Sequence, residues 1–219
     1  MKSPRSRLRV VRLVTNIGVR SREVLREAGP GVIAADRRLW PATLFYAAVT
    51  LALSAQQFTI DALYYLTDVR GGDWDLLLHP HHVLMEPAYF GWARLWGTLG
   101  WRGGDVLPLQ VLTVLVTTAA LALLLGVARR LLTGGAAALA VLWLAACHLP
   151  WSQATQPDAG PWFWLFAAVN VAWAARLPES RPGTRTVVQL AVTTALGILF
   201  HQALVLAAPV LAVLLARAA

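Results

Sequence analysis

Long apolar runs separated by short polar or basic segments organise the chain. A helix rises 1.5 Å per residue, so about 17–25 apolar residues cross the ~30 Å hydrocarbon core of a bilayer. Such runs occur at residues 43–60, 106–128, 131–149, 161–175 and 187–216. The last run is too long for one crossing and is interrupted by His201 and Gln202, so we expect two short helices that meet there. A single tilted helix is the alternative. The pattern predicts an all-α integral membrane protein, a multi-span helical bundle of about five or six membrane segments.

Composition supports a membrane protein and excludes several other classes. Of the 219 residues, 58% are hydrophobic and 14% are charged, whereas soluble domains carry roughly 25% charged residues. The net charge is +8, but the cations lie in bands between apolar runs, so no nucleic-acid partner is expected. The single cysteine, Cys147, excludes an internal disulfide framework and a cysteine-based zinc site.

The distribution of lysine and arginine predicts the topology. With residues 1–39 in the cytoplasm, the only cations on the outer side are Arg70, Arg94 and Arg102, as the positive-inside rule requires. We therefore expect a multi-pass protein of the cell inner (cytoplasmic) membrane with a basic cytoplasmic N-terminal segment, followed by a transmembrane module over 40–219. Residues 6–27 have the spacing of an amphipathic helix on the anionic leaflet; a disordered basic tail is the alternative.

The outer loop at 61–105 is the longest connection between the apolar runs, and long loops in compact proteins are usually functional or disordered. Its composition is not that of a disordered segment. Residues 83–99 are rich in leucine and aromatic residues but too short to cross the membrane and return. We expect them to form a helix that lies in the membrane plane.

Two acidic residues are the candidate catalytic groups. Asp61 follows the first apolar run directly, and a carboxylate at that depth in a membrane is by default a candidate functional group. Asp158 lies in the other outer loop, on the same side, so the two acids could converge over one cavity. The alternatives are that Asp61 only marks the end of a span, and that Asp158 caps the helix that begins near Pro161.

Candidate substrate-binding groups lie in the same outer segments. His79, His81 and His82 could bind a divalent ion, but Pro80 between them fixes an extended turn and not a helical pair. Hydrogen bonding to a phosphate or a sugar is favoured, and no metal cofactor is expected. Further candidates are His201 and Gln202, at the tip of the last hairpin, and the outer cations Arg94 and Arg102, for the charge of a phosphate. The alternative for His201 and Gln202 is a polar pair that only reaches the lipid headgroups.

In their order along the chain, these features resemble the GT-C superfamily of integral-membrane glycosyltransferases, most of all the protein O-mannosyltransferase and lipid A aminoarabinose transferase branch. The matching features are an acid after the first span, a His/Pro-rich turn with an in-plane helix, a second outer acid before an aromatic span, and an apolar hairpin with a polar tip. They are Asp61; His79-Pro80-His81-His82 with residues 83–99; Gln156-Pro157-Asp158 before Trp162-Phe163-Trp164; and Gly197 to His201-Gln202, leading to Pro209.

The resemblance implies transfer of a sugar from a polyprenyl-phosphate donor in the membrane lipid to an acceptor outside the cytoplasm. Asp61 would be the general base, and Asp158 would position the acceptor or assist Asp61. Relatives are longer, so the chain would correspond to their N-terminal membrane module. The alternative from another class is a non-catalytic membrane scaffold or lipid-binding subunit that retains the fold.

Overall fold

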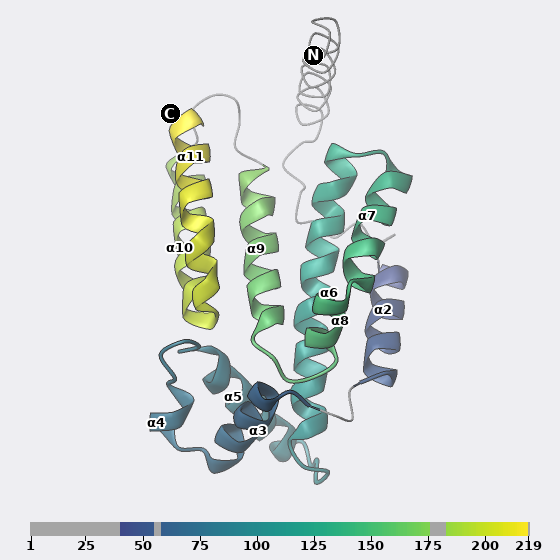
Figure 1. The fold of residues 1–219 in the computed structure, drawn as a ribbon, viewed down its shortest axis with the longest axis vertical. Coiled ribbons are helices and arrows are strands. Elements are labelled where there is room, and N and C mark those ends of the chain that lie inside the picture. Colours follow the sequence, from purple (N-terminus) through teal and green to yellow (C-terminus); the bar gives the residue numbers. More distant parts are fainter. Residues whose placement is uncertain (1–39, 55–57, 176–182, 219) are drawn as a thin grey trace, which may run out of the picture.

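The computed structural model describes residues 40–54, 58–175 and 183–218. Across these ranges every regular element is a helix and no strand is present, as predicted for an all-α protein. The elements form an upright bundle with a layer of short helices across one end (Figure 1). The basic N-terminal segment and the amphipathic helix predicted at residues 6–27 lie outside the described residues.

The bundle is centred on α6, which packs against α2, α7, α8 and α9 and also against α5 of the end layer. The last helices, α10 and α11, are joined through the 3-10 helix η2, and α10 packs against α9 (Figure 1). The bundle elements are α2 (Trp40–Ala52), α6 (Val106–Leu131), α7 (Gly134–Ala146), α8 (His148–Ala154), α9 (Gly160–Ala174), α10 (Thr184–Phe200), η2 (Gln202–Ala207) and α11 (Ala208–Ala218).

Among the described helices, α6 is long and apolar enough to cross a membrane by length and composition, with 26 residues. Helices α7 and α8 pass the same test only as a pair, bent by 64° at their junction. The ring of Pro150 would clash with the carbonyl of Ala146 in a continuous helix, which accounts for the end of α7 there. The single helix predicted at 131–149 is therefore two helices.

The first predicted span, at 43–60, is also wrong in its extent. Helix α2 ends at Ala52, and Ile60 is the first residue of α3 (Ile60–Gly71). Thr59 has an extended backbone, and its hydroxyl accepts the N–H of Ala62 at 3.3 Å. A capped helix with Asp61 in its first turn is favourable, because an acidic side chain there complements the helix dipole.

The predicted break in the last apolar run is confirmed. Helix α10 ends at Phe200, and His201 is extended, with φ −156° and ψ 111°. The Nδ1 atom of His201 accepts the N–H of Ala203 at 3.1 Å, so the histidine caps η2. The chain therefore reverses at His201 and Gln202.

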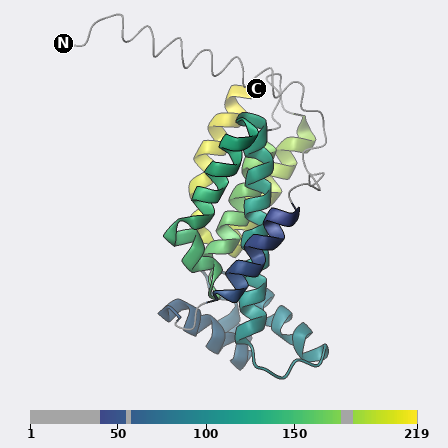
Figure 2. The same cartoon turned by 90° about the vertical axis from the view of Figure 1, so that its right-hand side faces the viewer.

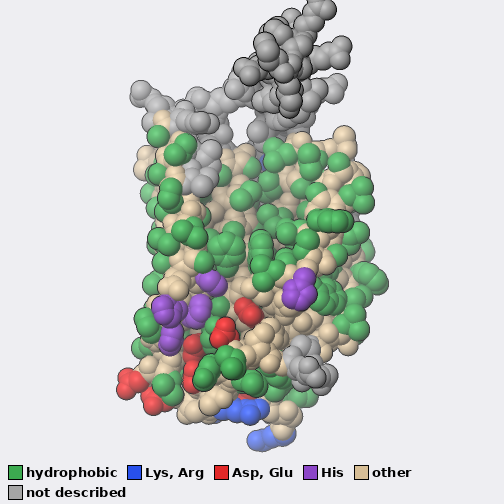
Figure 3. Space-filling view, viewed as in Figure 1, with side chains coloured by type: hydrophobic (Ala, Val, Ile, Leu, Met, Phe, Trp, Pro, Cys, Tyr) green, Lys and Arg blue, Asp and Glu red, His purple; other side chains and the backbone are tan. Residues whose placement is uncertain are grey.

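The end layer contains α3, α4 (Trp74–Leu77) and α5 (Met85–Thr98), and α5 is the helix predicted at 83–99. Figure 2 shows the layer crossing the end of the bundle. Its buried side chains form one cluster with side chains of the bundle. Burial of each large side chain in this cluster stabilises the contact between the end layer and the bundle by about 1.5–3 kcal/mol. This cluster contains Leu66, Val69, Leu77, Met85, Tyr89, Leu109 and Ala159. On the face in Figure 3, acidic and most histidine side chains gather towards this end, while the bundle above shows mainly hydrophobic side chains.

Candidate functional site

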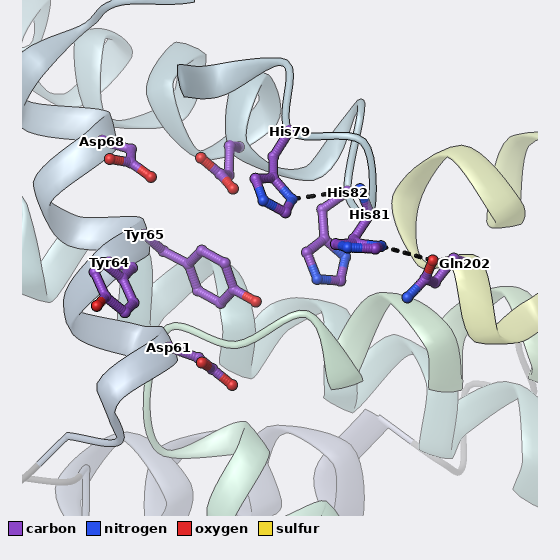
Figure 4. A pocket seen from close by; sticks show the side chains of 9 residues that line it. Asp61, Tyr64, Tyr65, Asp68, His79, His81, His82 and Gln202 are labelled. Carbon is purple, nitrogen blue, oxygen red and sulfur yellow. Dashed lines mark hydrogen bonds between the residues drawn. The ribbon is translucent and has the colours of Figure 1, made fainter. Parts of the chain in front are cut away.

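A pocket of about 440 Å³ lies where the end layer meets the tip of the last hairpin (Figure 4). We call it the end pocket. Four of its side chains come from α3, three from the turn between α4 and α5, one from α5 and one from η2. They are Asp61, Tyr64, Tyr65, Asp68, His79, His81, His82, Glu86 and Gln202.

One face of α3 forms a wall of the pocket. Asp61, Tyr65 and Asp68 are spaced four and three residues apart, which places them on the same side of a helix. Burial raises the pKa of Tyr65, and the nearby carboxylates, with Asp158 first among them, raise it further. The Tyr65 hydroxyl therefore stays protonated at neutral pH. Its ring packs edge-on against the His82 ring, with centroids 5.8 Å apart.

The His-Pro-His-His turn gathers its three imidazoles near the last hairpin. The His79 and His81 rings are 5.0 Å apart, and the His82 and His201 rings are 5.2 Å apart. The His81 Nδ1 atom and the Gln202 Oε1 atom form a hydrogen bond of 2.8 Å (Figure 4). His201 itself does not line the end pocket but packs behind His82.

The imidazoles of His82 and His201 are uncharged at neutral pH. Burial lowers the pKa of His82 to about 4, with a further contribution from His201, and burial also lowers the pKa of His201. The Nδ1 atom of His82 is buried and has no hydrogen-bond partner. Within the described ranges, no group of three or more His, Cys, Asp or Glu side chains is placed to hold a metal ion.

Two further carboxyl groups, those of Asp68 and Glu86, line the end pocket. Glu86 on α5 is only 2% exposed, and its Oε2 atom has no hydrogen-bond partner. Burial raises the pKa of Glu86 to about 7, and the charge of Asp68 adds to the rise. The end pocket therefore contains a carboxyl group that changes charge near neutral pH.

Asp158 lies beside the end pocket without lining it. Its Oδ1 atom accepts the N–H of Gly160, the first residue of α9, at 2.7 Å, while the N-cap residue of that helix is Ala159. Burial raises the pKa of Asp158, and the carboxylate of Asp61 raises it further. The two predicted catalytic acids therefore lie within electrostatic range of each other.

The turn that carries Asp158 is fixed to the end layer by direct hydrogen bonds. The N–H of Thr59 donates to Gln156 Oε1 at 3.0 Å, which ties the turn to the start of α3. The Tyr89 hydroxyl on α5 donates to the carbonyl of Asp158 at 2.8 Å and accepts its N–H at 3.2 Å. These bonds set the position of Asp158 relative to Asp61.

The two arginines expected to face a phosphate are not at the pocket. The Arg94 guanidinium lies over the Phe90 ring, 4.7 Å from its centroid, in a cation–π contact. Arg102 is exposed in the segment between α5 and α6. Neither is among the described residues that line the end pocket, and that lining contains no lysine or arginine.

The sequence interpretation missed four lining residues: Tyr64, Tyr65, Asp68 and Glu86. The helical spacing from Asp61 to Asp68 was a usable signal, because it would have placed Tyr65 and Asp68 on one face of a helix with Asp61. Glu86 was visible as an acid at the start of an apolar helix, a position that is costly without a functional or structural partner.

Comparison of the chain with protein families, curated proteins and solved structures finds no match. The likeness to GT-C glycosyltransferases therefore remains a prediction that depends on the order of its sequence features. The function is inferred from the chemistry of the end pocket and the helices around it.

Proposed function

We propose that the chain is a membrane glycosyltransferase, or the N-terminal module of one, that moves a sugar from a polyprenyl-phosphate donor to an acceptor outside the cytoplasm. One observation carries the proposal: Asp61 lines a polar pocket at the end of an apolar helical bundle, with Asp158 in electrostatic range. In this proposal the bundle has five or six membrane segments, the N-terminus is cytoplasmic and the end pocket opens at the outer surface of the cell inner membrane.

The apolar surface of the bundle supports its placement in a membrane. Large hydrophobic side chains are largely exposed on the surface of the bundle. Among them are Trp143, which is 77% exposed, Leu139, which is 69% exposed, and Leu206, which is 76% exposed. Water-soluble monomers rarely expose such side chains over a contiguous area. Lipid chains would cover them at no cost, while the acids and imidazoles gather at the end of the bundle (Figure 3).

The proposed chemistry needs one positioned base. The Asp61 carboxylate takes the proton of an acceptor hydroxyl as its oxygen forms a bond to the anomeric carbon. The bond between that carbon and the phosphate oxygen breaks, and the phosphate leaves with the electron pair. The amide N–H groups of Gln202 donate hydrogen bonds to sugar or phosphate oxygens. In this proposal Asp158, held by its hydrogen bonds to α9 and Tyr89, positions the acceptor or assists Asp61.

Replacement of Asp61 by Asn tests the proposal, since the amide keeps the shape of the side chain and cannot accept the proton. The full chain is reconstituted in liposomes with a panel of polyprenyl-phosphate-linked hexoses, and sugar transfer is measured. We expect transfer to fall by roughly 10²- to 10⁴-fold, the usual contribution of a general base. Asp75→Asn is the matched control, because Asp75 is an exposed acid of α4 outside the pocket. Its transfer rate should equal that of the wild type.

Equal transfer by the Asp61→Asn variant would refute the assigned base. If no donor in the panel is used and both variants insert and assemble normally, the result favours the non-catalytic scaffold. Use of a donor from the panel therefore separates the two classes of function, and the pair of substitutions tests the assigned base.

A further inference from the structure

Glu86 carries a buried oxygen atom without a partner. The residue is only 2% exposed although its side chain lines the end pocket, and its Oε2 atom has no hydrogen-bond partner. An ionised carboxylate can only accept hydrogen bonds. A buried acceptor that is left unsatisfied costs more free energy than an ordinary hydrogen bond contributes. The pocket therefore presents an acceptor that a ligand with a hydrogen-bond donor would satisfy.

The charges around the pocket favour a ligand that is positively charged. Three carboxyl groups line the pocket, from Asp61, Asp68 and Glu86, and its described lining contains no lysine or arginine. Burial lowers the pKa of His82 to about 4, so this imidazole adds no positive charge near neutral pH. An anion would be repelled by every ionised carboxylate that it approaches, whereas a cation is attracted by each of them.

The part of the pocket where α3 meets α5 has several groups that attract a cation. The two helices pack against each other, and the charge of Asp68 acts on Glu86. The electron-rich faces of the Tyr64 and Tyr65 rings also attract cations, and Figure 4 shows Tyr65 extending from α3 towards the histidine turn. Asp61 lies two helical turns before Asp68, roughly 10 Å along the axis of α3. A cation at Glu86 therefore lies apart from Asp61.

We propose that the end pocket binds the primary ammonium group of a small organic amine, which donates a hydrogen bond to Glu86 Oε2 and is attracted by the Asp68 carboxylate. An ammonium group combines a positive charge with three N–H donors. The pocket, of about 440 Å³, also has room for a carbon chain. A phosphate beside the ammonium group, as in an ethanolamine lipid headgroup, would be repelled, so the ligand is a free amine. The inference does not depend on the proposed sugar transfer.

Binding of butylamine to the purified full chain tests this site. The chain is kept in an uncharged maltoside detergent at about pH 8, where the amine is protonated and Glu86 is mostly ionised. Isothermal titration calorimetry measures the dissociation constant. We expect butylamine to bind at least about tenfold more tightly than butanol, its uncharged counterpart. Tetramethylammonium, which has the charge but no N–H donor, and glycerophosphoethanolamine, which adds a phosphate, should both bind more weakly than butylamine.

Substitutions test whether the ammonium group lies at Glu86. Glu86→Gln keeps the shape of the side chain but removes its charge, so the affinity for butylamine should fall by roughly 10- to 100-fold, the usual contribution of a hydrogen bond to a charged group. Asp68→Asn removes a partly exposed charge and should lower the affinity by up to about fivefold. Asp75→Asn is the matched control, because this exposed acid lies outside the pocket and should leave the affinity unchanged. Thermal unfolding verifies that each variant is folded.

The inference is overturned when any of the three comparison compounds binds as tightly as butylamine, or when a folded Glu86→Gln variant keeps the wild-type affinity. If that variant does not fold, Asp68→Asn takes its place, and an affinity equal to that of Asp75→Asn overturns the inference. Asp61→Asn separates this site from the glycosyltransferase proposal, because it should lose sugar transfer and keep its butylamine affinity within about threefold. Amine binding without sugar transfer refutes the enzyme alone, and sugar transfer without amine binding refutes this site alone.

Discussion

Replacing Tyr89 by Phe removes one hydroxyl group from the place where the end layer holds the turn of Asp158. Tyr89 is 0% exposed, and its hydroxyl donates to the carbonyl of Asp158 at 2.8 Å and accepts the N–H of the same residue at 3.2 Å. The hydroxyl of Thr113 on α6 is 3.0 Å away. A single atom therefore connects α5, α6 and the turn before α9.

The size of the effect follows from what the substitution leaves behind. Phe fills the same buried space, so packing changes little, but the carbonyl and N–H of Asp158 lose their partner. A buried polar group without a partner costs roughly 1–3 kcal/mol. The N–H bond is at the long end of the hydrogen-bond range, so most of the loss comes from the carbonyl. We expect Tyr89→Phe to lower the free energy of unfolding by roughly 1–3 kcal/mol in total.

Unfolding by titration with a denaturing detergent, followed by tryptophan fluorescence, measures this difference. Tyr64→Phe is the matched control, because its hydroxyl belongs to a side chain that is 62% exposed and water can replace its interactions. A change within about 0.5 kcal/mol is expected for the control. An equally small change for Tyr89→Phe would refute the argument that its hydroxyl secures the Asp158 turn.

Two further predictions concern stability. A Cβ atom added at Gly197 on α10 would overlap the side chain of Leu204, so Gly197→Ala should destabilise the fold by roughly 1–3 kcal/mol in the same unfolding assay, whereas Gly126→Ala, which meets open space, should not. The pKa of Glu86 is raised from 4.5 to about 7, so its contribution to the free energy of unfolding falls as pH rises through that range. The pKa of His82 is lowered from 6.5 to about 4, so its contribution rises with pH through that range. The two trends oppose each other between pH 4.5 and 6.5, so Glu86→Gln should show stability that rises with pH there, and a profile identical to the wild type would contradict these assignments.

The hydropathy pattern predicted helices best where charged residues mark their ends. The run at 106–128 lies between Asp105 and the pair Arg129 and Arg130, and α6 begins where predicted and extends through these arginines to Leu131. The run at 43–60 failed because hydropathy averages over a window and is insensitive to a helix cap. Thr59 ends one apolar stretch and starts a new helix without changing the mean hydropathy.

The sequence could predict those parts of the candidate site that lie together because their turns are on the same side of the bundle. His81 and Gln202 are 121 residues apart, yet they form a hydrogen bond, because both lie in turns on the same side of the bundle. The same reasoning placed Arg94 near them, but it could not predict which way the side chain points, because packing sets the rotation of α5 about its axis. That packing directs Arg94 onto Phe90, away from the pocket.

Asp68 and Glu86 show why the charge of the end pocket could not be predicted from the sequence. Asp68 is an ordinary acid in a polar helix, and Glu86 is an acid at the start of an apolar one; neither has a motif around it. They line the same pocket because α3 and α5 pack side by side around a shared core that contains Leu66 and Tyr89. Burial of that core also removes Glu86 from water and so raises its pKa. The apolar residues of this core therefore determine how far the pKa of Glu86 is raised, and substitutions in the core should change that pKa without touching the pocket.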